Sequence, residues 1–564
     1  MGNTASSLDY MSFMARLTQR DVDKEDTFWT EILSLAPQRT ELSIPSSRLM
    51  NEIAHKYPEN LKKLLDFCGN YLELMSGAEA NAIVPQNVRN QISVVLSIFS
   101  MGIVVLVSDK DNEGIFNSIK DSLIPRFIKS CNKCMYIKNL CVFGETEYWK
   151  ASQCEPGIHL LRRDFLHSVL IMFNISKIAK YDVSSFQIDV QLSSSLFINS
   201  LCQYSYSFVR SFNYGNDFAS LIDFLKNGYA LMAKISLIDP EFGSAISEIP
   251  NHLAVGAFTG SKSLTSTSIL SFNPVSPITS ESLTFLYLVS LYKPDFAEYL
   301  ATNGVSNIFI ADLLLTMQNT YESVGFCYLH SIVVSTILIL TYPPQGAKLL
   351  NEQFTSSFQS SYRPHRGSYA DLLIEIMSNF ADNDSLISSI ICLFHHIAPY
   401  LTNSTLYSSF RLLQLFEKLN SLPMKEKNRR MIELLLETFA KIIQTKPLLN
   451  TNMLILISQK AHLFKKLKTD NIGFNASLDI ILKFLSEAKR VLIKNNKRKL
   501  STDEAVEAIK QINTDELFPT VTVFDDHPHV FEGEMKDTFL EWSNLLFMRT
   551  FDTETEKLKI LKLL

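Results

Sequence analysis

The chain has 564 residues, of which 46% are hydrophobic and 20% are charged, and it contains only 18 glycines and 19 prolines. This composition excludes an intrinsically disordered or collagen-like protein. The formal net charge of −5 gives no electrostatic basis for tight nucleic-acid binding, so we expect no nucleic-acid partner. Length alone allows roughly three or four domains, although a continuous helical solenoid of this size needs no division.

Apolar residues recur at helical spacing along almost the whole chain. One stripe of a helix in residues 428–444, for example, is formed by Ile432, Leu435, Leu436, Phe439, Ile442 and Ile443. Short polar turns such as 402–404 and 420–423 have the length typical of antiparallel helix neighbours. The sequence therefore predicts an all-α fold, a degenerate HEAT or armadillo-like helical solenoid with no visible repeat signature.

The predicted helical stretches follow one another in chain order at 47–66, 86–107, 163–180, 193–211, 216–235, 280–302, 305–319, 323–341, 370–378, 384–400, 404–420, 428–444, 450–467, 472–496 and 535–550. The clearest strand signal is the short segment 518–524, which does not make a sheet by itself. We expect an N-terminal segment with a first helix (1–45), a helical region (46–255), a flexible loop rich in Ser, Thr, Gly and Pro (256–280), a helical solenoid (281–500) and an acidic helical tail (501–564).

The N-terminus lacks the pattern of a secretory signal, so we expect a cytoplasmic protein whose eight cysteines are reduced. The densest apolar stretches, 92–107 and 328–342, are shorter than the roughly 20 residues that cross a bilayer. Both are interrupted by Ser, Gly or His, and we expect them to be buried core helices.

Catalytic signatures are missing from the sequence. It contains neither a phosphate-binding GxxxxGK[ST] or GxGxxG loop nor an HExxH or GxSxG motif, and we expect no catalytic residues and no cofactor. The closest approach to a metal site is Cys131-x2-Cys134, followed by Cys141, Cys154, His159 and His167. Because a structural zinc site usually repeats the tight spacing in its second half, we interpret these thiols as buried among helices and expect no metal.

Two histidine-containing clusters have simple structural explanations. The segment Asp525-Asp526-His527-Pro528-His529 has the composition of a polar turn, and its alternative is a metal site for a cryptic hydrolase that uses Asp525, His527 and His529. His395 and His396 are adjacent in a predicted helix, so they cannot face the same way and do not form a shared site.

The first residues contain a lipidation signal. Met1-Gly2-Asn3-Thr4-Ala5-Ser6 satisfies M-G-x-x-x-[ST], in which removal of Met1 frees the Gly2 amine for myristoylation. A single myristoyl chain binds membrane only marginally, so a second signal is needed. No cysteine precedes Cys68 and the first basic residue is Arg16, which excludes nearby dual acylation and an adjacent polybasic stretch.

Charge is unevenly distributed near the C-terminus. Residues 460–500 contain 11 Lys or Arg and three acids, whereas residues 501–564 contain 14 acids and six basic residues. One interpretation is two solvated faces of opposite sign that pair with each other. The other is a contact with anionic lipid. The candidate residues for that membrane contact are Lys489, Arg490, Lys494, Lys497, Arg498 and Lys499.

Several segments in collinear order resemble the high-temperature-induced dauer formation protein family, which is related to dymeclin. The likeness begins with Met1-Gly2 and Ser6 and continues through 26–29, 147–149, 164–166, 281–354 (including Gly325–His330), 370–374, 398–401, 434–443, 450–464 and 539–549. Longer members have a low-complexity insertion before the last helices, where this chain has only 467–475.

The resemblance implies a non-catalytic, N-myristoylated peripheral protein on the cytosolic face of Golgi or trans-Golgi membranes, which supports the sorting and trafficking of secretory vesicles. Its partners would be the membrane, through the myristoyl chain, and unidentified trafficking proteins. Two alternatives stay open from the residues themselves. One is a cytosolic helical adaptor without a membrane role, and the other is the metal-dependent hydrolase.

Overall fold

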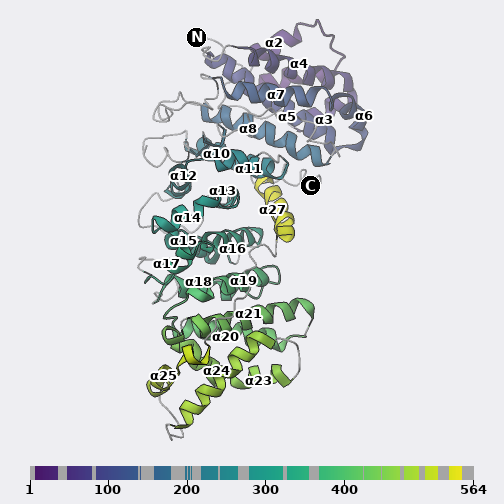
Figure 1. Ribbon diagram of the computed structural model, residues 1–564. Helices are drawn as coiled ribbons and strands as arrows, with labels where there is room; N and C mark the ends of the chain where they lie inside the picture. The colour runs from purple at the N-terminus through teal and green to yellow at the C-terminus, as the bar shows by residue number, and fades with distance from the viewer. Residues whose placement is uncertain are drawn as a thin grey trace. The chain divides into compact units, whose positions relative to one another are not determined.

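The structure is a computed structural model of the whole chain (Figure 1). It describes residues 7–35, 47–78, 84–137, 140, 158–178, 197–199, 201–202, 205, 218–238, 242–263, 279–321, 327–354, 367–423, 425–445, 447–469, 475–494, 502–518 and 532–548. These residues form 26 α-helices and no β-strand, apart from one isolated bridge between Gln353 and Ser368. The predicted all-α fold is confirmed for this part of the chain.

The chain divides into two compact units. Unit 1 comprises Met1–Ser271, Ser276–Tyr292 and Leu540–Leu564. Its helices are α1 (Ser7–Met14), η1 (Ala15–Thr18), α2 (Phe28–Ser34), α3 (Ser47–Lys56), α4 (Pro58–Ser76), α5 (Gln86–Ser108), η3 (Lys110–Asn112), α6 (Glu113–Ile119), α7 (Leu123–Met135), α8 (Ile158–Ile178), α10 (Phe218–Ile238), α11 (Phe242–Ser247), α12 (Asn251–Ser263) and α13 (Thr279–Tyr292).

Unit 2 comprises Phe272–Val275 and Lys293–Phe539. Its helices are α14 (Pro294–Thr302), α15 (Ser306–Asn319), α16 (Cys327–Thr341), α17 (Pro344–Leu349), α18 (Tyr369–Phe380), α19 (Ile387–Ile397), η7 (Ala398–Tyr400), α20 (Leu406–Ser421), α21 (Glu426–Thr445), η8 (Pro447–Leu449), α22 (Thr451–Gln459), α23 (Ala461–Thr469), α24 (Asn475–Lys494), α25 (Thr502–Lys510) and α26 (Thr514–Leu517). The last helix, α27 (Glu532–Met548), begins in unit 2 and continues from Leu540 in unit 1.

Unit 1 is a succession of helices that each pack on the next. Helix α4 packs against α5 and α7, α5 packs against α8, α8 against α10, and α10 against α13. The core between α5 and α7 contains the stacked rings of Phe99 and Phe127. Close packing of α4 on α5 depends on Gly102, because an added Cβ there would lie 2.7 Å from Leu65.

The second half of α27 completes unit 1 from the far end of the chain. Trp542 is buried and its indole Nε1 donates a hydrogen bond of 2.7 Å to Thr284 Oγ1 on α13. Lys234 on α10 donates to the side-chain oxygen of Asn544. The core of unit 1 therefore contains residues separated by about half the chain.

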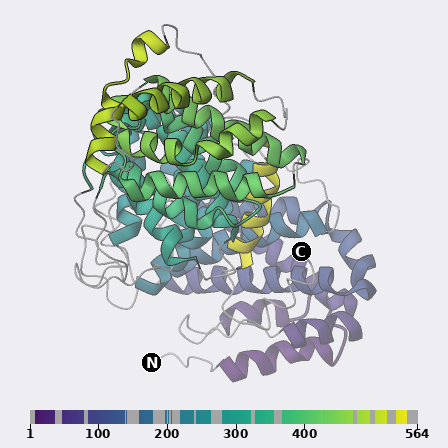
Figure 2. The ribbon, with the colours of Figure 1, turned by 90° about the horizontal axis from the view of Figure 1, so that it is seen from below.

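Unit 2 is built from two layers of helices (Figure 2). In one layer, α15 packs against α18, α18 against α20 and α20 against α22. In the other layer, α16 packs against α19, α19 against α21 and α21 against α24. Helices α15, α18 and α20 of the first layer are each followed in the chain by a helix of the second, as in the stacked pairs of a helical solenoid. This arrangement agrees with the predicted HEAT or armadillo-like architecture.

Successive turns of unit 2 are joined by asparagine side chains. Asn351 Nδ2 donates to the carbonyl oxygen of Tyr400 at 2.9 Å, and its Oδ1 accepts from the Thr402 amide at 2.8 Å. Asn450 Nδ2 donates to the carbonyl oxygen of Leu401 at 2.8 Å. These contacts satisfy backbone groups that the short turns would otherwise leave unpaired. We call this row of turns the asparagine edge.

The asparagine edge contains a repeat that the sequence did not make visible. Asn351 follows Leu350 directly after α17, which begins at Pro344, and Asn450 follows Leu449 after Pro447. Asn351 binds a carbonyl 49 residues later in the chain and Asn450 binds one 49 residues earlier, so both asparagines contact the same turn at residues 400 and 401. The repeat therefore lies in the turns, whereas the helices between them vary in sequence.

A buried carboxylate fixes α18 against α20. Asp371 forms a capping box with Ser368 at the start of α18. Its other oxygen accepts hydrogen bonds from the Thr405 amide at 2.8 Å and from Ser408 Oγ at 2.6 Å, at the start of α20. Since a buried charge must be paired or fully hydrogen-bonded, this side chain defines how the two helices begin side by side.

Helix α5 confirms the predicted helix at 86–107 to within one residue and is longer than its densest apolar stretch, 92–107. It spans 23 residues because the polar residues after Pro85 continue the helix, so it has the length and hydropathy of a membrane span. Two-thirds of its apolar window is buried against protein, and its buried side chains include Arg89, Ser93 and Ser100. Helices α14 and α15 would pass the same test only as one span bent by 109°. Burial among α3, α4 and α8 is typical of a core helix.

Three other predicted segments differ in detail. The stretch 280–302 is two helices, because Lys293 and Pro294 end α13 and begin α14. Residues 256–263 of the predicted loop belong to α12, where buried Ala257 and Phe258 continue the apolar face of the helix. The rest of that loop, from 264 to 278, lies outside the described residues, as does the extended segment 518–524 apart from Phe518.

Candidate functional site

The predicted lipidation site lies outside the part of the chain that the structure describes. Gly2 and Ser6 both precede α1, which begins at Ser7. The segment with Asp525, His527 and His529, interpreted as a polar turn with a metal site as the alternative, also lies outside the described residues. Both stay predictions from the sequence.

The basic segment is described only at its beginning. Lys489 and Arg490 are exposed near the end of α24, and Arg490 pairs with Glu487 through its Nε at 2.8 Å. This ion pair raises the pKa of Arg490. Lys494 belongs to α24, but its side chain is not described, and Lys497, Arg498 and Lys499 lie outside the described residues. A joint surface of all six residues therefore stays a prediction.

The two closely spaced cysteines are core residues of α7. Cys131 and Cys134 are fully buried, and Cys134 Sγ approaches the carbonyl oxygen of Leu72 at 3.9 Å. Burial raises the pKa of the Cys134 thiol to about 12, so it stays protonated and is a poor metal ligand at neutral pH. The interpretation of these two residues as thiols buried among helices is confirmed.

The other members of that cluster do not extend it. Cys141 and Cys154 lie outside the described residues, the side chain of His159 is not described, and His167 is half-buried on α8. Within the described residues, no group of three or more His, Cys, Asp or Glu side chains has a geometry that could hold a metal ion.

His395 and His396 contact different partners, as expected for adjacent positions on a helix. His396 Nε2 lies 2.9 Å from the carbonyl oxygen of Thr341 at the end of α16, and its ring stacks on Tyr342. His395 Nε2 lies 3.0 Å from Glu437 Oε2 on α21. Each histidine therefore joins α19 to a neighbouring helix of its layer.

Unit 2 contains a groove of about 600 Å³, which we call the α20 groove. It lies where the C-terminal ends of α15 and α18 meet the second half of α20. Its lining residues are Gln318, Tyr321, Ser378, Asn379, Phe380, Ala381, Asp382, Arg411, Gln414, Leu415 and Lys418. Its volume falls within the usual range of ligand sites, roughly 300–1,000 Å³.

Two basic side chains line this groove in different electrostatic states. Lys418 is paired with the carboxylate of Asp382. Arg411 instead donates to two neutral amide oxygens, Asn379 Oδ1 at 2.5 Å and Gln414 Oε1 at 3.1 Å. Its Nε has no hydrogen-bond partner among the described residues. Arg411 is thus held in place by neutral groups and keeps its positive charge.

The exposed face of α20 continues from the groove towards the start of the helix. Tyr407, Arg411, Gln414 and Lys418 follow one another at helical spacing on this face, and Phe410 lies beside them. Tyr407 is 56% exposed and Phe410 43% exposed. Large apolar side chains on a solvent face are typical of contact surfaces when they cluster.

Sequence reasoning predicted the helix at 404–420 but did not identify this surface. The buried stripe of α20, which includes Leu412, Leu415 and Phe416, accounts for the amphipathic pattern. The available signal was the presence of Tyr407 and Phe410 outside that stripe. Asn379 and Gln414 lie on different helices, so their common contact with Arg411 could not be read from spacing.

Comparison with known proteins identifies the region that contains these features. The family model described as High-temperature-induced dauer-formation protein matches residues 264–524. This region of the chain is similar to the high-temperature-induced dauer-formation protein family. The resemblance predicted from the sequence is thereby confirmed for residues 264–524. No curated protein and no solved structure matches the chain.

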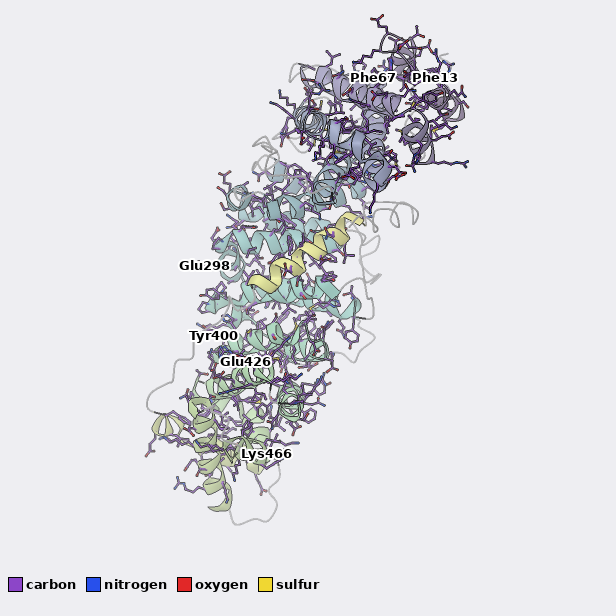
Figure 3. The ribbon with its side chains drawn as sticks, turned by 90° about the vertical axis from the view of Figure 1, so that its right-hand side faces the viewer. Phe13, Phe67, Glu298, Tyr400, Glu426 and Lys466 are labelled. Atoms are coloured by element: carbon purple, nitrogen blue, oxygen red, sulfur yellow. The ribbon has the colours of Figure 1, made fainter. Side chains whose placement is uncertain are left out.

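The family region coincides with most of unit 2. It includes both helix layers, the asparagine edge and the α20 groove. Figure 3 labels Tyr400, whose carbonyl oxygen accepts from Asn351, and also Glu298, Glu426 and Lys466, which all lie within the match. The match thus covers a stacked helical body, which is the kind of structure that offers extended surfaces to other proteins.

Proposed function

We propose that the protein is a non-catalytic peripheral membrane scaffold at the Golgi and trans-Golgi network, anchored by myristate on Gly2, which supports secretory vesicle sorting and trafficking. The observation that supports this proposal is the family match over residues 264–524, in a region of stacked helix pairs. Stacked helices present long surfaces on which other proteins assemble, and such a role requires no catalytic set.

The anchor follows from the first residues. Gly2 and Ser6 stand at the positions that N-myristoylation requires after removal of Met1. One myristoyl chain gives an association constant of only about 10⁴ M⁻¹, so binding to membranes is reversible unless a second contact is added. The folded body, a partner protein or the basic segment has to supply that contact.

Gly2→Ala tests the anchor directly. Wild-type protein expressed in cells should colocalise with a trans-Golgi marker. The Gly2→Ala protein should be cytosolic because N-myristoylation requires glycine at this position. Mass spectrometry of the N-terminal peptide gives an independent readout, since the acylated peptide has the added mass of a myristoyl chain. Ser7→Ala is the matched control because it leaves Gly2 and Ser6 intact. Gly2→Ala protein that stays on Golgi membranes would contradict the proposal.

The basic segment is our candidate for the second contact. Each Lys or Arg close to an anionic leaflet adds about 1 kcal/mol, so three residues in contact strengthen binding by roughly two orders of magnitude. Reversing the charge of Lys497, Arg498 and Lys499 should weaken binding to liposomes that contain phosphatidylserine and leave binding to neutral liposomes unchanged. The difference should shrink at high salt. Equal binding of both proteins to anionic liposomes would instead favour a partner protein.

Two measurements separate this proposal from its alternatives. A cytosolic helical adaptor would show no acyl mass on its N-terminal peptide and no membrane fraction. A metal-dependent hydrolase that uses Asp525, His527 and His529 would retain a stoichiometric metal ion after purification, and substitution of His527 by alanine would release it.

A further inference from the structure

Arg411 is an unneutralised cation at the wall of the α20 groove. Its two hydrogen bonds go to side-chain amides of Asn379 and Gln414, and no carboxylate of the described residues forms an ion pair with it. The acid that lines the groove, Asp382, is paired with Lys418. The lining therefore has a net positive charge that an anionic group of a ligand would complement.

The neighbouring surface determines what else the ligand must contain. Tyr407 lies one helical turn before Arg411 on the exposed face of α20, and Phe410 lies beside it. Across the groove, Tyr321 is 54% exposed and its ring packs edge-on against Phe380. A ligand along α20 would therefore meet a positive charge in the groove and an apolar surface next to it.

We propose that the α20 groove binds an acidic peptide segment of a partner protein, with a carboxylate of the peptide on Arg411 and a bulky apolar side chain against Tyr407 and Phe410. This proposal states what kind of partner the scaffold binds, and to that extent it rests on the proposed function. Guanidinium–carboxylate pairing supplies the specificity, and exposed aromatic side chains supply the contact area. The amide side chains of Gln318, Asn379 and Gln414 offer donors and acceptors to a peptide backbone.

A peptide fits these observations better than a membrane does. Attraction to an anionic leaflet typically requires clusters of about 4–8 basic residues, whereas this groove has Arg411 and a lysine that is already paired. The concave shape and the amide groups also suit a single extended chain better than a flat layer of headgroups. A lipid contact at this site is therefore the competing outcome of the test.

The peptide selection uses the purified full-length chain without membranes, and a separate arm measures binding of phosphatidylserine vesicles to the wild-type and Arg411→Gln proteins. A phage-displayed library of random octapeptides is selected against the wild-type protein, and the enriched peptides are made with a fluorescent label. A second copy of each peptide has Asn or Gln in place of Asp or Glu. Binding is measured by fluorescence anisotropy, and circular dichroism verifies that each variant is folded.

Four variants locate the binding site. Arg411→Gln should weaken binding by about tenfold or more because the charged hydrogen bonds are lost, whereas Arg411→Lys should keep much of the affinity. Tyr407→Ser combined with Phe410→Ser should remove the preference for bulky apolar residues. Lys348→Gln is the matched control, since Lys348 is exposed on α17, lies outside the groove and forms no ion pair among the described residues.

The expected result is enrichment of Asp or Glu next to a bulky apolar residue, with affinity that depends on Arg411 and is lost in the amide copies. Selection without acidic enrichment, or equal binding by the Arg411→Gln protein, would overturn the proposal. So would binding of phosphatidylserine vesicles through Arg411 in the absence of peptide selection. Since Gly2 is not involved in this assay, a negative result here leaves the membrane anchor to be decided by the Gly2→Ala experiment.

Discussion

Phe439 lies at the centre of an aromatic cluster that joins three helices of unit 2, and its replacement by alanine tests the packing of the family region. Its side chain on α21 is fully buried. Its ring packs edge-on against Phe416 of α20 at 5.6 Å and against Phe464 of α23 at 6.1 Å, measured between ring centroids. Phe416 and Phe464 stack on each other at 5.0 Å. Removal of the Phe439 ring therefore leaves a cavity bordered by two aromatic residues.

The expected cost of Phe439→Ala is about 3–5 kcal/mol of unfolding free energy, the usual range for a buried phenylalanine whose surroundings relax only partly. About 0.5–1.5 kcal/mol of this comes from each aromatic pair that is lost. Phe439→Leu keeps most of the apolar volume and should cost less than Phe439→Ala. Leu422→Ala, at a side chain that is 41% exposed, is the control and should change stability by about 0.5 kcal/mol or less.

The distribution of tryptophan makes the assay specific for one unit. The three tryptophans, Trp29, Trp149 and Trp542, all belong to unit 1, and residues 293–539 contain no tryptophan. Denaturant unfolding followed by far-UV circular dichroism reports both units, whereas tryptophan fluorescence reports unit 1. Phe439→Ala should shift the unfolding transition of unit 2, which circular dichroism detects and tryptophan fluorescence does not. A change below about 1 kcal/mol would show that Phe439 is not in a packed core and would refute the reasoning.

Two further residues give predictions of different kinds. Burial lowers the pKa of His330 from 6.5 to about 4, and its Nε2 lies 2.8 Å from Thr320 Oγ1. The folded state binds the proton less well than the unfolded state does. The stability that neutral His330 contributes is therefore fully present above the unfolded pKa of 6.5, and up to about 3 kcal/mol of it is lost as the pH falls from 6.5 to about 4. His330→Gln should remove this pH dependence, and urea unfolding at several pH values would measure it. If the unfolding free energy of the variant depended on pH in the same way as that of wild type, His330 would not be its source. Trp542→Phe removes the hydrogen bond to Thr284 and should cost about 1–3 kcal/mol in thermal unfolding of unit 1, and no measurable change would show that the contact does not stabilise it.

The helices were predictable because the forces that select them are local. The apolar stripe in 428–444 predicted a buried face, and Ile432, Leu435 and Phe439 are all buried on α21. A helix places residues three and four apart on one face wherever it packs, so the pattern survives without knowledge of the partner. The pattern does not show which residues of other helices pack against the stripe. Nothing in the stripe indicated that Phe439 would meet both Phe416 and Phe464.

The contacts between turns could not be predicted in this way. Asn351 and Asn450 both bind carbonyl oxygens that lie 49 residues away. An asparagine in a polar turn is common and has several uses, such as a cap or a turn former. Only the fold brings each amide to a carbonyl of the neighbouring turn. The same reason explains why Asp371 was assigned to a helix but not to the contact with Thr405 and Ser408.

The candidate site shows the same division between local and distant information. The helix that contains Arg411 was predicted, and its exposed aromatic neighbours are visible in the sequence. The electrostatic state of Arg411 was not, because it depends on Asn379 from α18 and on the pairing of Lys418 with Asp382. Because Lys418 pairs with the nearby carboxylate of Asp382, Arg411 has only neutral partners. This arrangement depends on how the helices pack.

The position of Trp542 has a consequence for how the membrane proposal must be tested. The family match ends at residue 524, but the core of unit 1 requires α27, whose Trp542 and Asn544 contact α13 and α10. Unit 1 is also the unit that begins with the segment containing Gly2. Protein truncated at the family boundary would leave the buried surfaces of α10 and α13 exposed, and exposed apolar surface binds membranes and other proteins non-specifically. Retention of such a truncated protein on membranes would therefore say nothing about the myristoyl anchor, so Gly2→Ala has to be compared with wild type in the full-length chain.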